Sequence, residues 1–165
     1  MNGVDGPKRS IGYLEPGGGS EVAMLLDTRV TSKVTASQTG GAYSLFELEV
    51  APGGGERRHI QHREDECLYV LEGRFEFSIE GETLPVAEGT TLYIPKGTVH
   101  GFENLDESPG RLLAIHTPGG THESFVEEAG ARVTGQASPP AGSLPNPQSF
   151  AATAAKHGIE LVPPP

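Results

Sequence analysis

The stretch Gly89–Asn104 reads G-T-T-L-Y-I-P-K-G-T-V-H-G-F-E-N and carries the strongest structural signal in the chain. An alternation of polar and apolar residues ends at Ile94, is broken by the P-K-G triplet of residues 95–97, and resumes at Val99. Because proline fixes φ and glycine permits a tight reversal, this pattern predicts a strand, a turn and a second strand. The turn places His100 at the start of the second strand, with its imidazole on one defined face.

A second polar stretch, R-R-H-I-Q-H-R-E-D-E-C-L-Y-V-L-E-G, occupies residues 57–73. Side chains alternate between the two faces of a strand, so His59 and Gln61 point the same way and His62 points the other way. Together with Glu66, these residues offer nitrogen and oxygen donors. Two such polar strands that face each other indicate a metal site inside a β-barrel.

The rest of the chain predicts an all-β fold, a double-stranded β-helix (jelly roll) with a short C-terminal helical tail. Glycine (23) and proline (14) are abundant, which fits many short strands joined by turns. Besides the two stretches above, strands are expected at residues 21–27, 29–35, 43–50, 75–79, 82–86 and 111–117. Helices are expected only after about residue 120, at 122–130 and from Asn146-Pro147 to a stop at Gly158. The expected regions are an N-terminal extension (1–20), the barrel (21–130), and a linker with the C-terminal helix (131–165).

The two polar stretches together resemble the motifs of the cupin family. The second motif of that family, G-x5-P-x-G-x2-H-x3-N, is matched by Gly89, Pro95, Gly97, His100 and Asn104. The first motif, roughly G-x5-H-x-H-x3,4-E-x6-G, is matched by Gly53, His59, Glu66 and Gly73, and Gln61 stands where a second histidine is usual. The resemblance covers about residues 20–130, and in detail the chain is similar to the small quercetinase-like single-domain cupins.

The resemblance implies that His59, Glu66 and His100 bind a divalent metal ion, with the amide oxygen of Gln61 as a weaker fourth ligand. Imidazole and carboxylate suit Fe, Mn, Ni, Zn or Cu, and the ligand types do not choose among these metals. A second interpretation stays open, in which the cage has lost its metal and Gln61 is only a polar residue of the barrel.

A substrate pocket and two proton-transfer partners are also predicted. Strand alternation turns Arg57 toward the cavity, where it would hold an anionic oxygen, although a surface ion pair is the alternative. The same argument predicts a mostly apolar lining from Phe75, Phe77, Thr91, Tyr93 and Phe102. Glu66 is the candidate catalytic base, with His116 or Tyr93 as its partner.

Three further histidines are interpreted less specifically. His62 is expected on the outer face of its strand. His122 and His157 lie in the tail regions and are expected to be solvated.

Composition limits the partners and the compartment. A formal net charge of −10 argues against nucleic acid or an anionic membrane surface as a partner. No apolar run approaches the roughly 20 residues of a transmembrane helix. The single cysteine, Cys67, fits a reducing compartment, so we expect a cytoplasmic protein. A homodimer is expected from the resemblance, through the strand pair at residues 21–35.

The sequence as a whole favours a metal-dependent enzyme that acts on a small enolisable, aromatic or polyketide-like metabolite. The neutral amide of Gln61 leans toward redox-neutral chemistry, namely isomerisation, cyclisation or elimination. The quercetinase-like motifs imply the alternative, a dioxygenase that cleaves its substrate with O2. A metal-free cupin that only binds a small molecule is the third interpretation.

Overall fold

The computed structural model of the protein describes residues 11–132 and 146–164. Segments in which polar and apolar residues alternate form its strands. The strands are β1 Ser20–Leu25, β2 Thr28–Val34, β3 Ser44–Val50, β4 Gly55–Gln61, β5 Asp65–Glu72, β6 Arg74–Ile79, β7 Glu82–Ala87, β8 Thr91–Ile94, β9 Val99–Asn104, β10 Gly110–Thr117 and β11 Ile159–Leu161. The helices are α1 Ala36–Thr39, α2 Thr121–Ala129 and α3 Pro147–Lys156. Residues 1–10 of the expected extension and 133–145 of the expected linker lie outside the described residues.

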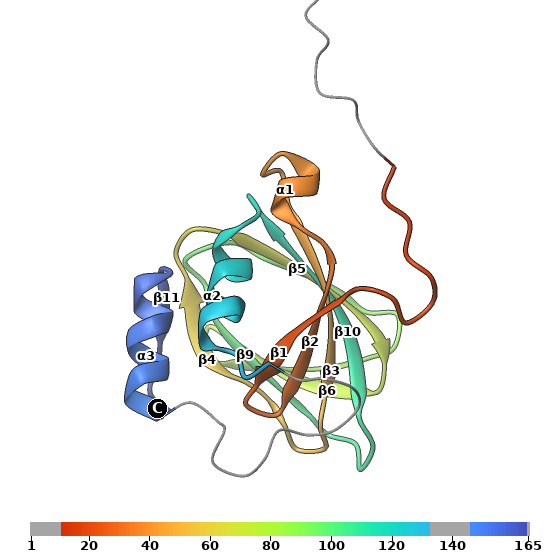
Figure 1. Cartoon of the computed structure of the whole chain (residues 1–165). Coiled ribbons are helices and arrows are strands. Elements are labelled where there is room, and N and C mark those ends of the chain that lie inside the picture. The colour runs from red at the N-terminus through yellow and green to blue at the C-terminus, as the bar shows by residue number, and fades with distance from the viewer. Residues whose placement is uncertain (1–10, 133–145, 165) are drawn as a thin grey trace, which may run out of the picture.

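Two antiparallel sheets form the jelly roll. The first has the strand order β1-β2-β3-β10-β5-β8 and the second has the order β11-β4-β9-β6-β7. Figure 1 shows the strands curving around a common interior, with α2 and α3 together on one side and α1 at one end. This arrangement confirms the predicted all-β double-stranded β-helix.

The core lies between the two sheets and follows from the alternation along each strand. In β3, Phe46, Leu48 and Val50 are buried, whereas Glu47 and Glu49 face outward. Apolar side chains from β5, β6 and β10 complete this interior. Removing these side chains from water is the main favourable contribution to folding, on the order of 2 kcal/mol per fully buried Leu or Phe.

One short helix contradicts the expectation that no helix precedes residue 120. Helix α1 is a single turn that begins after Thr35, whose side chain accepts from the backbone N–H of Gln38 while the Gln38 side chain accepts from the Thr35 N–H. This capping box satisfies two backbone donors, and Gly40 ends the turn in the left-handed region at φ 65°. None of the helices in the described part of the chain is long and apolar enough to cross a membrane.

The C-terminal segment does more than the sequence predicted. Helix α3 begins at the expected Asn146 cap, and the chain then forms β11, which pairs with β4. Ile159 lies opposite Gln61 and Leu161 lies opposite His59. A strand of three residues is too short to show an alternation, which is why the sequence did not reveal it.

Candidate functional site

Three side chains from three strands meet in the interior of the barrel. His59 on β4, Glu66 on β5 and His100 on β9 are all buried, and their ligand atoms lie within 4.8 Å of one another. His59 and His100 are opposite each other in the β4–β9 pairing. The Nε2 atom of His100 is 2.9 Å from Oε2 of Glu66. The structure therefore brings together the three residues that the resemblance implies as metal ligands.

Backbone carbonyls fix how the two imidazoles are turned. Nδ1 of His59 donates to the carbonyl oxygen of Arg57 at 2.8 Å, and Nδ1 of His100 donates to that of Thr98 at 3.0 Å. With Nδ1 occupied in this way, Nε2 of each ring points to the centre of the group. Histidines that bind metals in proteins are commonly oriented by such a second hydrogen bond.

Gln61 and His116 form the next layer around Glu66. Nε2 of Gln61 donates to Oε2 of Glu66 at 3.4 Å, and Oε1 of Gln61 accepts from Nδ1 of His116 at 3.2 Å. Nε2 of His116 lies 3.5 Å from Oε1 of Glu66. The Gln61 amide is thus at the group, but its nitrogen faces Glu66, so its role as a fourth ligand stays a prediction. His116, one of the two partners predicted for Glu66, points inward.

Burial and neighbouring charges set the protonation states of the three candidate ligands. Burial alone would raise the pKa of Glu66, but the hydrogen bond from His100 and the nearby imidazoles lower it to about 2. Burial lowers the pKa of His59 to about 4, whereas the Glu66 carboxylate outweighs burial and raises that of His100. Oε1 of Glu66 is buried and accepts no hydrogen bond from the described residues. An ionised carboxylate with a buried oxygen that accepts no hydrogen bond, beside two inward-facing imidazole Nε2 atoms, fits a divalent cation.

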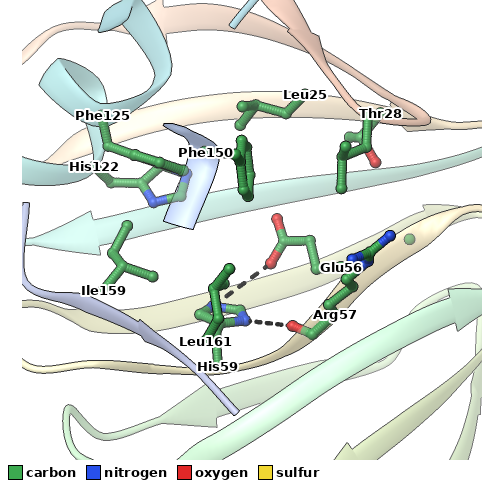
Figure 2. Close-up of a pocket in the computed structure, with 12 residues that line it drawn as sticks. Leu25, Thr28, Glu56, Arg57, His59, His122, Phe125, Phe150, Ile159 and Leu161 are labelled. Carbon is green, nitrogen blue, oxygen red and sulfur yellow. Dashed lines mark hydrogen bonds and ion pairs between the residues drawn. The ribbon is translucent and has the colours of Figure 1, made fainter. Parts of the chain in front are cut away.

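A β-bulge adds a carboxyl group that the sequence analysis did not identify. Glu56 pairs with Phe102 and His59 pairs with His100, so two residues of β4 stand opposite the single Gly101 of β9. The extra residue reverses the alternation, and both Glu56 and His59 face the site. Oε2 of Glu56 is 3.8 Å from Nε2 of His59 (Figure 2).

Glu56 is unusual among the carboxyl groups of the chain. Its Oε2 is buried and accepts no hydrogen bond from the described residues. Burial, with the charge of Glu66, raises its pKa to about 8, so the carboxyl group is mostly protonated near neutral pH. Arg57, which simple alternation turned inward, is exposed but borders both pockets described below.

A second buried group lies beside the first and consists of Glu64, His116 and His122. Glu64 accepts the backbone N–H groups of Thr121 and His122 at the start of α2, at 2.7 and 3.0 Å. The rings of His116 and His122 are stacked, with centroids 3.9 Å apart and planes at 7°. Imidazole lone pairs lie in the ring plane, so one ion cannot lie in the planes of both stacked rings, which makes this group a poorer fit to a metal than the first.

The expectation that His122 is solvated is wrong. Its side chain is buried because α2 folds back onto the barrel, where His122 also lies edge-on to Phe46. His157, also expected in solvent, has only 13% of its side chain exposed and bonds to Glu128 at 2.7 Å. His62 faces outward as predicted and bonds to Glu160.

An apolar pocket adjoins His59, one of the three candidate ligands (Figure 2). Glu56, His59 and Arg57 of β4 border it on one side. The side chains that complete it come from the β1–β2 region, α2, α3 and β11: Leu25, Leu26, Thr28, His122, Phe125, Phe150, Ile159 and Leu161. A more polar pocket of about 430 Å³ shares Leu26, Gly55, Glu56 and Arg57 with it and also includes Phe102. The two pockets therefore meet at Glu56.

Most of the side chains expected to line the pocket lie elsewhere. Phe75 and Phe77 are fully buried and pack around Phe102 as part of the barrel core, with ring centroids 5.9 and 5.1 Å from Phe102. Thr91 and Tyr93 are on the outer face of β8; Tyr93 is 64% exposed and its hydroxyl donates to Asp65. The prediction of their inner placement is wrong, and Tyr93 is not near Glu66 as a proton partner. The prediction reversed the inward-facing parity across the turn, but the side chains that face inward are at even-numbered positions in both strands, as Ile94 in β8 and His100 in β9 show.

Comparisons with known proteins agree with this architecture. The sequence model of the family described as Cupin domain matches residues 46–116. An uncharacterised protein of Methanocaldococcus jannaschii is 34% identical over 84 residues, which cover 51% of this chain and 67% of that protein. The polyketide synthase protein CurC of Streptomyces cyaneus is 32% identical over 85 residues, 52% of this chain and 54% of that protein.

A solved structure supports the fold independently. The polyketide cyclase RemF from Streptomyces resistomycificus superposes with a TM-score of 0.59 at 22% identity, over 66% of this chain and 80% of that chain. The segment matched by the family model contains all three candidate ligands as well as Gln61 and His116. From its motifs, its double-stranded β-helix and these matches, the chain belongs to the cupin superfamily.

Proposed function

We propose that this protein is a metal-dependent cupin enzyme that acts on a small enolisable or aromatic metabolite by redox-neutral chemistry, namely isomerisation, cyclisation or elimination. The observation that carries this proposal is the convergence of His59, Glu66 and His100 beside an apolar pocket. The two Nε2 atoms are fixed by backbone hydrogen bonds before any ion binds, which lowers the cost of ordering the site on binding.

The proposed chemistry divides between the ion and the side chains. When bound, a divalent ion supplies Lewis-acid polarisation of a substrate oxygen. Gln61 holds Glu66 in place by a hydrogen bond from its amide, and His116 in turn orients that amide by donating to its oxygen. The carboxyl group of Glu56 faces the pocket with a buried oxygen that bonds to no described residue, so we assign it to a substrate hydroxyl or enol oxygen.

The redox-neutral assignment rests on Gln61 and on the named relatives. An amide is a weaker donor than the imidazole that usually stands at this position, and a less electron-rich ion is less suited to a redox cycle with dioxygen. The relative CurC is named as a polyketide synthase protein, and RemF is named as a polyketide cyclase. Cyclisation of an enolisable polyketide-like substrate is therefore the reaction type that we favour.

The dioxygenase alternative is favoured by the quercetinase-like first motif. An oxygen electrode and an anaerobic chamber separate the two reactions with a panel of hydroxylated aromatic and polyketide-like substrates. We expect turnover by the zinc-loaded protein without oxygen, because zinc has no redox chemistry. Strict dependence on oxygen and on Fe, Ni, Mn or Cu would establish the dioxygenase instead.

A metal-free binding protein is the remaining alternative, and the orientation of the Gln61 amide favours it. The amide nitrogen, which cannot bind a cation, is the atom that faces Glu66. Elemental analysis of the purified protein decides this point. A stoichiometric first-row metal supports the enzyme, and its absence after expression and dialysis with each candidate metal supports the binding protein.

A further inference from the structure

We propose that the C-terminal segment, residues 146–162, is the substrate-selecting wall of the site, and that Phe150 and Leu161 contact the apolar ring system of the substrate. This inference rests on the proposed function in one respect, which is that the polar end of the same ligand reaches the three candidate metal ligands. The segment lies outside residues 46–116, the part matched by the family model.

The backbone places this wall directly beside the candidate ligands. Leu161 lies opposite His59 in the β11–β4 pairing. The pairing continues on both sides, because the N–H of His62 donates to the carbonyl of Gly158 and the N–H of Val162 donates to that of Arg58, each at 2.9 Å. The position of Leu161 relative to His59 is therefore set by main-chain hydrogen bonds.

Aromatic packing and ion pairs hold α3 against α2. Phe150 lies edge-on to Phe125 with ring centroids 5.6 Å apart. Away from the pocket, Lys156 and His157 both bond to Glu128 of α2, at 2.8 and 2.7 Å. The wall is thus anchored at the end of α3, whereas Phe150, near its start, is only half-buried.

The wall and the opposite side of the pocket differ in polarity. The C-terminal segment contributes only apolar side chains to the lining, namely Phe150, Ile159 and Leu161. The β4 side contributes Glu56, Arg57 and His59. A ligand that satisfies both sides has a flat apolar part and an oxygen-bearing edge. Sugars and small diacids such as oxalate would leave hydroxyl or carboxylate groups unpaired against the wall.

The size of the pocket indicates how such a ligand enters. The apolar pocket has a free volume of about 60 Å³, smaller than the roughly 150 Å³ of a cavity that takes benzene. The adjoining polar pocket provides about 430 Å³ more. Phe150 is half-buried and the anchoring ion pairs are at the other end of α3, so we expect its side chain to turn aside when a ring enters. We therefore assign the site to hydroxylated ligands of one or two fused aromatic or quinonoid rings.

Tryptophan is absent from the chain, which permits a direct test. The variant Phe150→Trp places the sole tryptophan in the wall, and Leu84→Trp places it at a 43% exposed position on β7 as a matched control. The probe is 2-hydroxy-1,4-naphthoquinone, added to the metal-loaded full-length protein. We expect saturable quenching of the indole fluorescence in Phe150→Trp, because the bound ring lies against this position. In Leu84→Trp we expect only linear collisional quenching.

A second pair of variants tests the polarity of the wall. Leu161→Asn introduces an amide opposite His59, and Leu105→Asn does so at a 47% exposed site outside the pocket. By calorimetry, Leu161→Asn should weaken binding of the naphthoquinone at least tenfold, whereas Leu105→Asn should leave it unchanged. Metal content and melting temperature, measured on the same samples, show whether each variant is folded and loaded. Should Leu161→Asn unfold, Leu161→Ala replaces it, with the same expectation of weaker binding.

The outcomes separate this inference from the proposed function. Unsaturable quenching in Phe150→Trp or wild-type affinity in the Leu161 variant would overturn the wall, whatever the metal content. The absence of naphthoquinone binding by wild type would overturn the assigned ligand class. If the wall variants lose probe binding while wild type holds no metal, the wall stands and the metal-dependent function fails.

Discussion

At the scale of single residues, the site depends on which side chains reach the interior. Alternation along a strand correctly placed His59 and Gln61 inside and His62 outside. It failed at Glu56, because the bulge in β4 reverses the alternation between Glu56 and His59. A bulge depends on how two strands pair, and the pairing of β4 with β9 joins residues far apart in the sequence. No pattern within β4 alone could have revealed the bulge.

Glu56 leads to a prediction about the pH dependence of stability. Burial raises its pKa in the folded protein to about 8, against 4.5 for an ordinary glutamate. Folding therefore takes up a proton between these values, and the contribution of Glu56 to stability is lost as the pH rises from about 4.5 through about 8. Glu56→Gln removes this titration. For the protein with chelator present, we expect the variant to equal wild type near pH 5 and to exceed it at pH 8.5 by on the order of a few kcal/mol.

Urea unfolding between pH 5 and pH 9 measures this difference. Glu103→Gln is the control, because Glu103 is an exposed residue on the neighbouring strand β9. If wild type and Glu56→Gln lose stability in parallel over this range, the burial assigned to the Glu56 carboxyl group is incorrect.

At the scale of elements, the close approach of β4 and β9 shapes the site. A Cβ at Gly55, whose φ is 157°, would lie 1.9 Å from the carbonyl oxygen of Phe102. A Cβ at Gly101 would lie 2.7 Å from that of Glu56. The sequence predicted both strands from their alternation, but it did not predict how close they come. The same limit applies to β8 and β9, where two strands and a turn were predicted, but neither the change of sheet between them nor the outward facing of Tyr93.

A pair of glycine variants tests this close approach. Gly53 is also at positive φ, 67°, but a Cβ there would meet nothing within 4 Å. Gly53→Ala therefore carries only backbone strain, whereas Gly55→Ala carries strain and a clash with the main chain of β9. We expect Gly55→Ala to destabilise the protein by roughly 2 kcal/mol or more beyond the effect of Gly53→Ala. We also expect it alone to weaken metal binding, because it displaces His59.

Equilibrium unfolding and metal titration of the two variants provide the comparison. Equal losses of stability in the two variants would show that β9 gives way without cost and that Gly55 is not required for the bulge.

At the scale of the whole molecule, the C-terminal segment and the group of His59, Glu66 and His100 join parts of the chain that are distant in the sequence. The predicted jelly roll and tail helix are confirmed, but the sequence did not show that the tail returns to β4 and borders the pocket. Such docking depends on long-range packing of a few apolar side chains. The homodimer through β1 and β2 stays a prediction. On the side of β1 that faces away from β2, Met24 already pairs with Ala131, which leaves less of that edge for a second copy.

Metal binding should stabilise the whole fold, because the candidate ligands come from three strands in both sheets. An ion that binds only the folded state adds about 2.7 kcal/mol at a free concentration roughly 100 times its dissociation constant. For a chain of this size, we expect chelation to lower the melting temperature by roughly 5–10 °C. Differential scanning calorimetry with and without EDTA measures this shift. The same treatment should leave His100→Ala unchanged, and an equal shift in that variant would show that the chelator acts elsewhere.

The metal content of two histidine variants is the sharpest test of the proposed metal centre. His100→Ala removes a buried candidate ligand, and His62→Ala removes an exposed histidine just beyond β4 that bonds through its side chain only to Glu160 among the described residues. After equal loading and dialysis, elemental analysis should find about one equivalent of metal in wild type and His62→Ala, and less than about a tenth of that in folded His100→Ala. Full metal content in His100→Ala, or its loss in His62→Ala, would contradict a metal centre formed by His59, Glu66 and His100.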